Sequence, residues 1–252
     1  MFKKIFKLMA AFVLFPAVIA FSLYSLDQQG FFQIDNVEIK VQTTESQKNF
    51  VAPRLQKLQA KLDSVKGISL WKAPLSQISK SLREEKWIKN FQLSRSWPST
   101  IKLVIEPDTV TLLVLSSASG SETSALLPIT KSGRVLERIS SDDAPNAIVS
   151  YDESLVKNER VREGAINVIK ALPEKGRMSS TQISEIGYDK KEGYWIKLLQ
   201  SETKVNLGEE QFEIKSVRIA QVMEYLESRN LKARVIDANL SKKVLVRLQQ
   251  NP

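Results

Sequence analysis

Residues 91–106 read FQLSRSWPSTIKLVIE and contain two apolar runs on either side of a turn. Residues 91–93 are typical of a strand, and a second strand follows because apolar residues recur at every second position: Ile101, Leu103 and Ile105. Between them, Trp97-Pro98-Ser99 predicts a turn, since proline fixes its φ angle and lacks the N–H that a strand ladder needs. The stretch therefore predicts a strand, a turn and a second strand.

The residues before this unit predict a strand and two helices. Residues 34–41, IDNVEIKV, show the alternation of a strand. Four apolar residues then recur at the helical spacing i, i+4, i+7 and i+11: Val51, Leu55, Leu58 and Leu62. A second helix opens at Ala73-Pro74, because proline is well tolerated in the first turn of a helix. Residues 31–110 are therefore expected to form one domain with the order β-α-α-β-β.

The residues after this domain predict a second one that is rich in strands. Residues 116–124, SSASGSETS, are small and polar and read as a linker. Residues 125–248 then predict a hairpin around Ser132-Gly133, helices near 155–172 and 210–228, and strands near 183–188, 194–199, 205–207, 234–238 and 243–248. The fold class is therefore α+β. The last strand is expected to form a sheet edge, and residues 249–252 a short tail.

The N-terminus predicts a single transmembrane helix. Residues 8–26, LMAAFVLFPAVIAFSLYSL, contain no charge, and a helix of that length covers roughly 28 Å, about the thickness of a bilayer's hydrocarbon core. Lys3, Lys4 and Lys7 precede this run without any acid, so residues 1–7 are expected to stay in the cytoplasm and the rest to be exported.

A cleaved signal peptide is the competing interpretation of the same residues. The start is basic, and Val18-Ile19-Ala20 has the small final residue that a cleavage site needs, which would leave a chain beginning at Phe21. However, the apolar run continues beyond that point. Both interpretations place residues 30–252 outside the cytoplasm.

The composition excludes much of catalytic chemistry. The chain has no Cys and no His, so it can hold neither a Ser-His-Asp triad, nor a Cys-His pair, nor any His/Cys metal site, and it forms no disulfide. Ser-x-x-Lys occurs four times without its companion motifs, which indicates chance. Of the net charge of +9, residues 1–26 carry +3, and the remaining +6 is too mild and too dispersed to indicate nucleic-acid binding.

Several motifs, in this order, resemble the bacterial cell-division family FtsQ/DivIB. GISLW at 67–71, WI at 87–88, RSWP at 95–98 and VIE at 104–106 are similar to an FtsQ-type POTRA domain. The second domain is similar more loosely, through GRV at 133–135, VNLG at 205–208 and VID at 235–237. The chain departs from the family pattern at Gln42, at Ile129-Thr130 and at Asp237-Ala238-Asn239.

The resemblance implies a non-enzymatic scaffold of the divisome, in the inner membrane at the septum, without cofactor, metal or small-molecule substrate. Its implied partners are FtsB-like and FtsL-like single-pass proteins. The strand at 243–248 offers a mode of binding, because an edge strand can accept a partner strand by β-augmentation. The expected partner-binding residues are Leu240, Lys242, Lys243, Leu245 and Arg247. Equally, this strand can be an ordinary edge whose lysines prevent aggregation.

Five further residues carry the POTRA resemblance and are expected to act mainly in the fold: Trp87, Arg95, Trp97, Pro98 and Glu106. Arg95 and Glu106 are expected to form a cross-strand ion pair. Two other classes remain open at this point. One is a POTRA-type chaperone or binding module in outer-membrane assembly or secretion, and the other is a soluble periplasmic enzyme released by signal cleavage.

Overall fold

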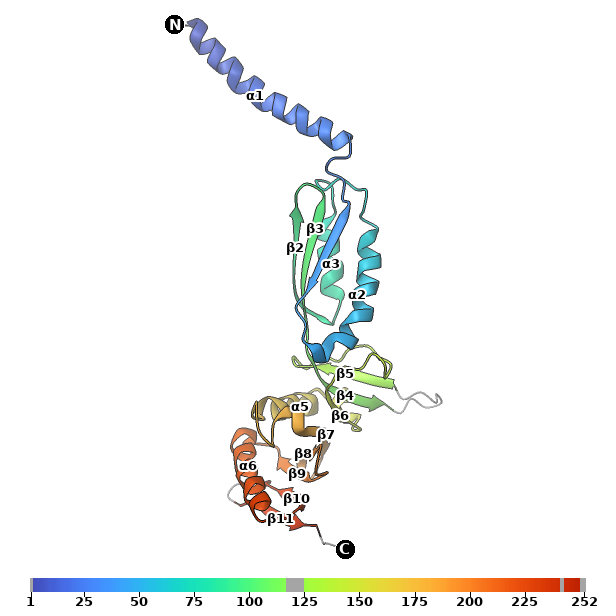
Figure 1. Cartoon of the computed structure of the whole chain (residues 1–252), viewed down its shortest axis with the longest axis vertical. Helices are drawn as coiled ribbons and strands as arrows, with labels where there is room; N and C mark the ends of the chain where they lie inside the picture. Colours follow the sequence, from blue (N-terminus) through green and yellow to red (C-terminus); the bar gives the residue numbers. More distant parts are fainter. Residues whose placement is uncertain (1, 117–124, 241–242, 250–252) are drawn as a thin grey trace. The chain divides into compact units, whose positions relative to one another are not determined.

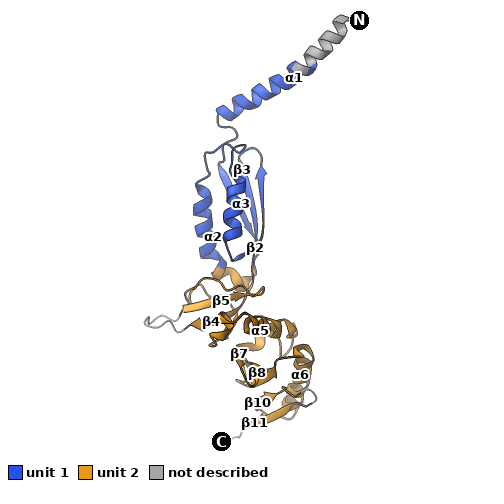
Figure 2. Cartoon of the chain, turned by 180° about the vertical axis from the view of Figure 1, so that it is seen from behind, with its two compact units in different colours: residues 1–43, 51–107 blue, residues 44–50, 108–252 orange. Residues whose placement is uncertain are grey.

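The structure is a computed structural model of the 252-residue chain, and it describes residues 2–116, 125–240 and 243–249. Side chains are described from Phe12 onward, except that of Val13. The chain divides into two compact units, one of residues 1–43 and 51–107 and the other of residues 44–50 and 108–252 (Figures 1 and 2).

The first element is a long helix, α1 (Phe2–Gln28), with Pro16 inside it. Within the described part of the chain, no helix meets the length and hydropathy expected of a membrane span. Of the predicted span at 8–26, the side chains of residues 8–11 and 13 lie outside the described residues. Large apolar side chains farther along α1 are exposed, among them Phe12, Phe15 and Phe21.

The rest of the first unit is a three-stranded sheet with two helices. The strands are β1 (Asn36–Val41), β2 (Ile88–Ser96) and β3 (Thr100–Pro107), in the order β1-β3-β2. β1 is parallel to β3, and β2 is antiparallel to it. The helices are α2 (Lys48–Asp63) and α3 (Leu75–Glu84). The short 3₁₀ helix η1 (Glu45–Gln47), which precedes α2 in the chain, belongs to the second unit. The predicted order β-α-α-β-β is confirmed.

The core of this unit follows from the alternation along β3. Ile101, Leu103 and Ile105 are fully buried, and the residues between them are partly exposed. Leu58 and Leu62 of α2 are buried as well, and so are Ile78 and Leu82 of α3, which form the helical half of the core. One face of the sheet therefore carries both helices (Figure 1).

The second unit is built on an eight-stranded sheet in the order β11-β10-β9-β8-β7-β6-β4-β5. In chain order its strands are β4 (Val110–Ser116), β5 (Ala125–Thr130), β6 (Ile148–Ser150), β7 (Ile183–Asp189), β8 (Gly193–Leu198), β9 (Lys204–Gly208), β10 (Ala233–Asp237) and β11 (Leu245–Leu248). Its helices are α4 (Ser154–Lys157), α5 (Glu159–Ala171), the 3₁₀ helix η2 (Ser180–Gln182) and α6 (Phe212–Ser228).

A row of aligned apolar residues crosses five strands of this sheet. Strand pairing aligns Ile186, Ile196, Val205, Ile236 and Val246, on β7, β8, β9, β10 and β11. The first four are buried, and Val246 is partly buried against the same core, to which α5 and α6 contribute. The core therefore extends to the last strand of the sheet.

Three details of this unit differ from the sequence-based expectation. β4 was not predicted, because residues 110–116 form a nearly continuous apolar run without the alternation that marks a half-buried strand. β6 is only three residues long and gives no pattern. The helix expected at 155–172 is two helices, because Asn158 is extended and caps α5 through its side chain, which accepts from the N–H of Val161.

The boundary between the units also lies elsewhere. The first domain was expected to reach residue 110, whereas the first compact unit ends at Pro107 and β4 belongs to the second. Residues 117–124 of the expected linker lie outside the described residues.

Candidate functional site

β11 is an edge strand of the eight-stranded sheet. It pairs antiparallel with β10, where Asp237 lies opposite Leu245 and Ile236 opposite Val246, and no described strand lies on its other side. The backbone groups on that outer side therefore have no strand partner within the described sheet. Such an edge can accept an added strand through main-chain hydrogen bonds.

The two faces of β11 differ in character. Val244 and Val246 pack against the core, whereas Leu245 is 53% exposed and Arg247 is also exposed. Successive side chains of a strand point to opposite faces, so Leu245 and Arg247 share the outer face. An added strand would therefore meet an apolar and a basic side chain next to its own backbone.

Most of the expected partner-binding residues gather at this edge. Lys243 is exposed just before β11, and Leu240 is exposed in the connection from β10. Lys242 lies outside the described residues. Leu248, at the end of β11, is 46% exposed and was not among the expected residues, because alternation places it on the inner face with Val244 and Val246.

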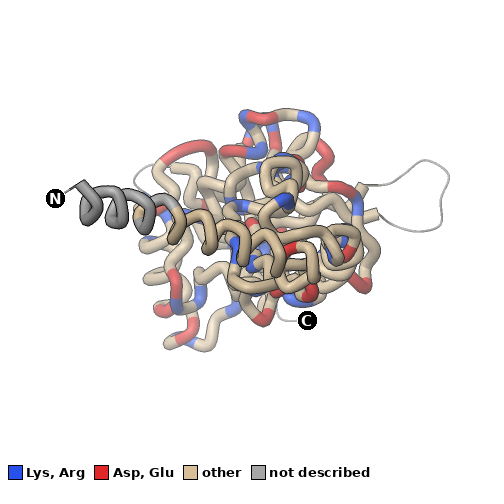
Figure 3. The backbone as a smooth tube through the Cα atoms, turned by 90° about the horizontal axis from the view of Figure 1, so that it is seen from above, with Lys and Arg blue, Asp and Glu red and all other residues tan. Residues whose placement is uncertain are grey.

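The charge around the edge is basic. Lys243 and Arg247 are exposed, and so is Arg234 on the neighbouring strand β10. Among the described residues, none of these three cations forms an ion pair within 4.0 Å. Elsewhere acidic and basic residues are interspersed along the backbone (Figure 3). The edge is therefore suited to a partner strand that carries acidic residues.

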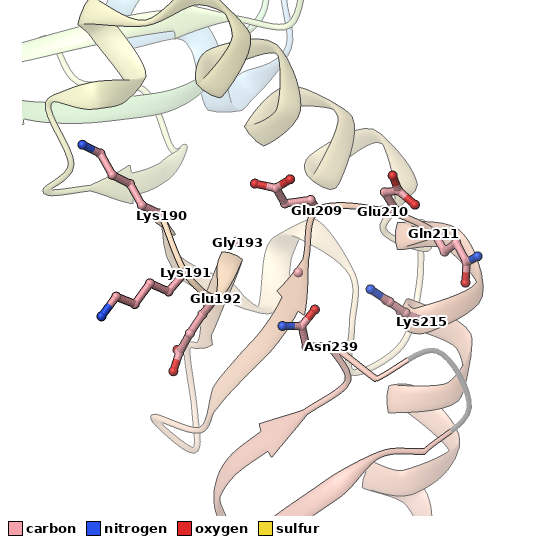
Figure 4. Close-up of a pocket in the computed structure, with 10 residues that line it drawn as sticks. Lys190, Lys191, Glu192, Gly193, Glu209, Glu210, Gln211, Lys215 and Asn239 are labelled. Carbon is pink, nitrogen blue, oxygen red and sulfur yellow. The ribbon is translucent and has the colours of Figure 1, made fainter.

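A polar cavity of about 450 Å³ lies where the connection to β11 begins (Figure 4). Lys215 of α6 is only 5% exposed there, and its Nζ donates to the Leu207 carbonyl over 2.7 Å. Burial lowers the pKa of Lys215. Asn239 lies so close to Gly208 that a Cβ atom added to Gly208 would be 2.2 Å from the Asn239 Oδ1. The close packing of Asn239 on Gly208 therefore fixes the start of the segment that leads to the edge strand.

A second cavity, of about 850 Å³, lies beside α5. Tyr188 and Tyr194 contribute to its lining, with ring centroids 4.9 Å apart, and the Tyr188 hydroxyl donates to Glu209 over 2.9 Å. That hydrogen bond raises the pKa of Tyr188. Within the described residues, no group of three or more His, Cys, Asp or Glu is placed to hold a metal ion.

Trp87 and Arg95, two of the residues that carry the POTRA resemblance, form hydrogen bonds within the first unit. Trp87 is buried and donates through Nε1 to Glu85. Arg95 on β2 donates from Nε to the Leu70 carbonyl over 2.7 Å and from Nη2 to the Ala73 carbonyl over 3.3 Å. Arg95 therefore ties the loop before α3 to the sheet.

The expected ion pair between Arg95 and Glu106 is wrong. The register of β2 and β3 places Arg95 opposite Ile101, whereas Glu106 lies opposite Asn90 at the far end of the pair. Glu106 accepts instead from Lys89 and Asn90. Spacing along the chain does not reveal which residues of two strands are opposite each other, and register decides that.

The predicted turn at 97–99 brings Trp97 into an aromatic cluster. Trp97 is 50% exposed, and the peptide bond to Pro98 is cis. Its ring centroid is 4.3 Å from that of Trp71 and 5.8 Å from that of Phe32. These aromatic residues come from three separate segments, so their spacing in the sequence does not reveal the cluster.

Comparison with known families matches both units. Residues 32–106 match the model of the FtsQ-type POTRA domain, and residues 121–239 match the C-terminal domain of the cell division protein FtsQ/DivIB. The second match ends at Asn239, before β11. No curated protein matches the chain. The two matches follow each other in the family's order, and the chain belongs to the FtsQ/DivIB family of cell division proteins.

Proposed function

We propose that this protein is a membrane-anchored, non-enzymatic scaffold of the bacterial divisome, which recruits or regulates other division proteins through its two units. The observation that carries the proposal is the pair of family matches, at 32–106 and 121–239. Both belong to a family of cell division proteins. The scaffold needs no cofactor, nucleic acid or small-molecule substrate.

The anchor is residues 8–26, with residues 1–7 in the cytoplasm and the two units in the periplasm. Support comes from the uncharged run, from the lysines that precede it, and from the exposed apolar side chains of α1. Mass spectrometry of the mature protein tests the anchor. An intact N-terminal segment is expected, and a mature chain that starts at Phe21 would contradict it.

The partners are FtsB-like and FtsL-like single-pass proteins, captured at β11 by β-augmentation. The open outer side of β11 supports this mode, as do the exposed Leu245 and the basic residues around the strand. A partner segment that is extended, partly apolar and acidic fits this edge.

A fluorescent fusion and a depletion strain test the divisome role together. The fusion is expected to gather at midcell, and depletion is expected to produce filamentous cells. A fusion with a charge-disrupted anchor, Leu14→Lys with Ile19→Lys, is the matched control for localisation. Diffuse fluorescence of the unaltered fusion with normal division after depletion would refute the role.

A further inference from the structure

The first unit carries an exposed aromatic cluster where α1 joins it, formed by Phe31, Phe32, Trp71 and Trp97. Phe32 is 7% exposed, and the other three rings are each at least half exposed. The ring of Phe32 lies 5.1 Å from Phe31 and 5.8 Å from both Trp71 and Trp97, measured between centroids. Three outward rings therefore rest on one buried ring.

Hydrogen bonds hold the segments of this cluster together. The N–H of Leu70 donates to the Phe32 carbonyl over 2.7 Å, and the N–H of Ile34 donates to the Ile68 carbonyl over 2.9 Å. Arg95 holds the same loop from the sheet. Because these hydrogen bonds hold the backbone of both segments in place, the rings stay exposed at this end of the unit.

The cluster lies next to the end of the proposed anchor. The N–H of Phe31 donates to the carbonyl of Leu26, the last residue of the uncharged run. In addition, the Ser69 hydroxyl donates to the Asp27 carboxylate over 2.6 Å. Five residues of extended chain span at most about 17 Å, so Phe31 cannot lie far from the end of that run.

We propose that this aromatic cluster is a membrane-contact surface, which rests in the interfacial layer of the bilayer on the periplasmic side. The inference rests on the proposed anchor. Tryptophan is enriched at membrane interfaces, because its ring is apolar while its N–H can remain hydrated. Ile68 adds an exposed apolar side chain beside the rings, and Lys72 is exposed where it can reach lipid phosphates.

A lipid surface fits this cluster better than a protein partner does. An anchored chain brings these residues to the bilayer without a separate binding event. The exposed apolar area would otherwise face water next to the membrane, which is unfavourable because water solvates apolar surface poorly. Contact with the interface removes that cost and fixes the first unit against the membrane.

Quenching by brominated lipids tests the contact. The full chain has four tryptophans, so three single-tryptophan variants, which keep Trp71, Trp97 or Trp87 and carry Phe elsewhere, are reconstituted into vesicles of phosphatidylethanolamine and phosphatidylglycerol. Brominated acyl chains are expected to quench Trp71 and Trp97 at least twofold more than Trp87. Trp87 is the matched control, because it precedes β2 at the opposite end of a strand that extends roughly 30 Å.

The unsubstituted chain gives a second reading, in comparison with a variant that keeps Trp87 and Trp195. Brominated lipid should quench a larger fraction of its emission than that of the variant with Trp71→Phe and Trp97→Phe. Equal quenching of Trp71, Trp97 and Trp87 would overturn the inference. Alkaline extraction of the same vesicles distinguishes failure of the membrane contact from failure of the anchor. A chain retained but unquenched refutes the contact alone, whereas a chain released by alkali refutes the anchor and the contact with it.

Discussion

Gly164 allows the ring of Tyr194 to approach the backbone of α5. The Tyr194 hydroxyl donates to the Val161 carbonyl over 3.0 Å, and the residue is 5% exposed. A Cβ at position 164 would lie 1.9 Å from that hydroxyl oxygen and 2.4 Å from the ring carbon that bears it. The contact between α5 and β8 therefore depends on the absence of a side chain at this position.

Gly164→Ala is expected to destabilise the protein by about 2 kcal/mol, as overpacking does, although alanine normally favours a helix over glycine by about 1 kcal/mol. Urea denaturation measures the difference. Glu163→Ala, at an exposed position of the same helix, is the control and should change stability by about 0.5 kcal/mol or less. A stability gain with Gly164→Ala would show that the Tyr194 ring moves to make room for the added methyl group.

The same tyrosine predicts a dependence of stability on pH. Burial raises the pKa of Tyr194 to about 12, from an ordinary value of 10.0. Between these values the unfolded chain has released the proton while the folded chain keeps it, so the contribution of Tyr194 is present below pH 10 and is lost as pH rises. Relative to Tyr194→Phe, the free energy of unfolding should fall by up to about 1.4 kcal/mol for each pH unit. Parallel pH profiles of the two proteins would contradict the raised pKa.

At the scale of elements, β11 is the strand proposed to capture the partner. Leu245→Glu is expected to abolish capture of the FtsB-like partner, because it removes an exposed apolar contact, places an acid opposite Asp237 and repels an acidic partner. A pull-down with the purified partner measures capture. Arg247→Pro, which removes a backbone donor from the strand, should act in the same direction.

Leu199→Glu is the matched control, since Leu199 is 58% exposed, close to the exposure of Leu245, and follows β8. It should capture the partner as the unaltered protein does. Circular dichroism of all variants separates lost binding from lost structure. Unchanged capture by both β11 variants would exclude this strand as the interface.

The loop before α3 depends on Arg95 in a way that a second pair of variants can reveal. Arg95→Ala removes donors to two carbonyls and should lower the free energy of unfolding by about 1–3 kcal/mol. Arg95→Lys keeps the charge but loses the guanidinium fork, so it should restore only part of that loss. Full stability in both variants would show that the loop holds without this contact.

Elements with a clear period were predictable from the sequence, and those decided by pairing were not. β3 and both helices of the first unit follow from apolar residues at regular spacing. β4 was missed because its residues are apolar on both faces. The partner of Glu106 was predicted wrongly because strand register is set in three dimensions. At the candidate site, the strand 243–248 was predictable, whereas the burial of Lys215 and the packing of Asn239 on Gly208 depend on segments far apart in the chain.

For the whole molecule, the proposed orientation in the membrane rests on the charge of the N-terminus. The three lysines before residue 8 should hold that end in the cytoplasm, since basic residues resist export. Replacing Lys3, Lys4 and Lys7 by Glu is expected to reduce export of the two units, measured with a reporter active only in the periplasm. Replacement of Lys40, Lys57 and Lys61 by Glu, which alters the same charge elsewhere, should leave export unchanged. Equal export in both would contradict the assigned orientation.

The position of β11 at the margin of its sheet also affects how fast its amide hydrogens exchange with solvent. With one strand neighbour, its backbone amides can exchange with solvent after a small local opening, without disruption of β7 or β8. A partner strand on the open side would make β11 an interior strand. Exchange at its amides should then slow greatly, while exchange in the centre of the sheet stays as it was.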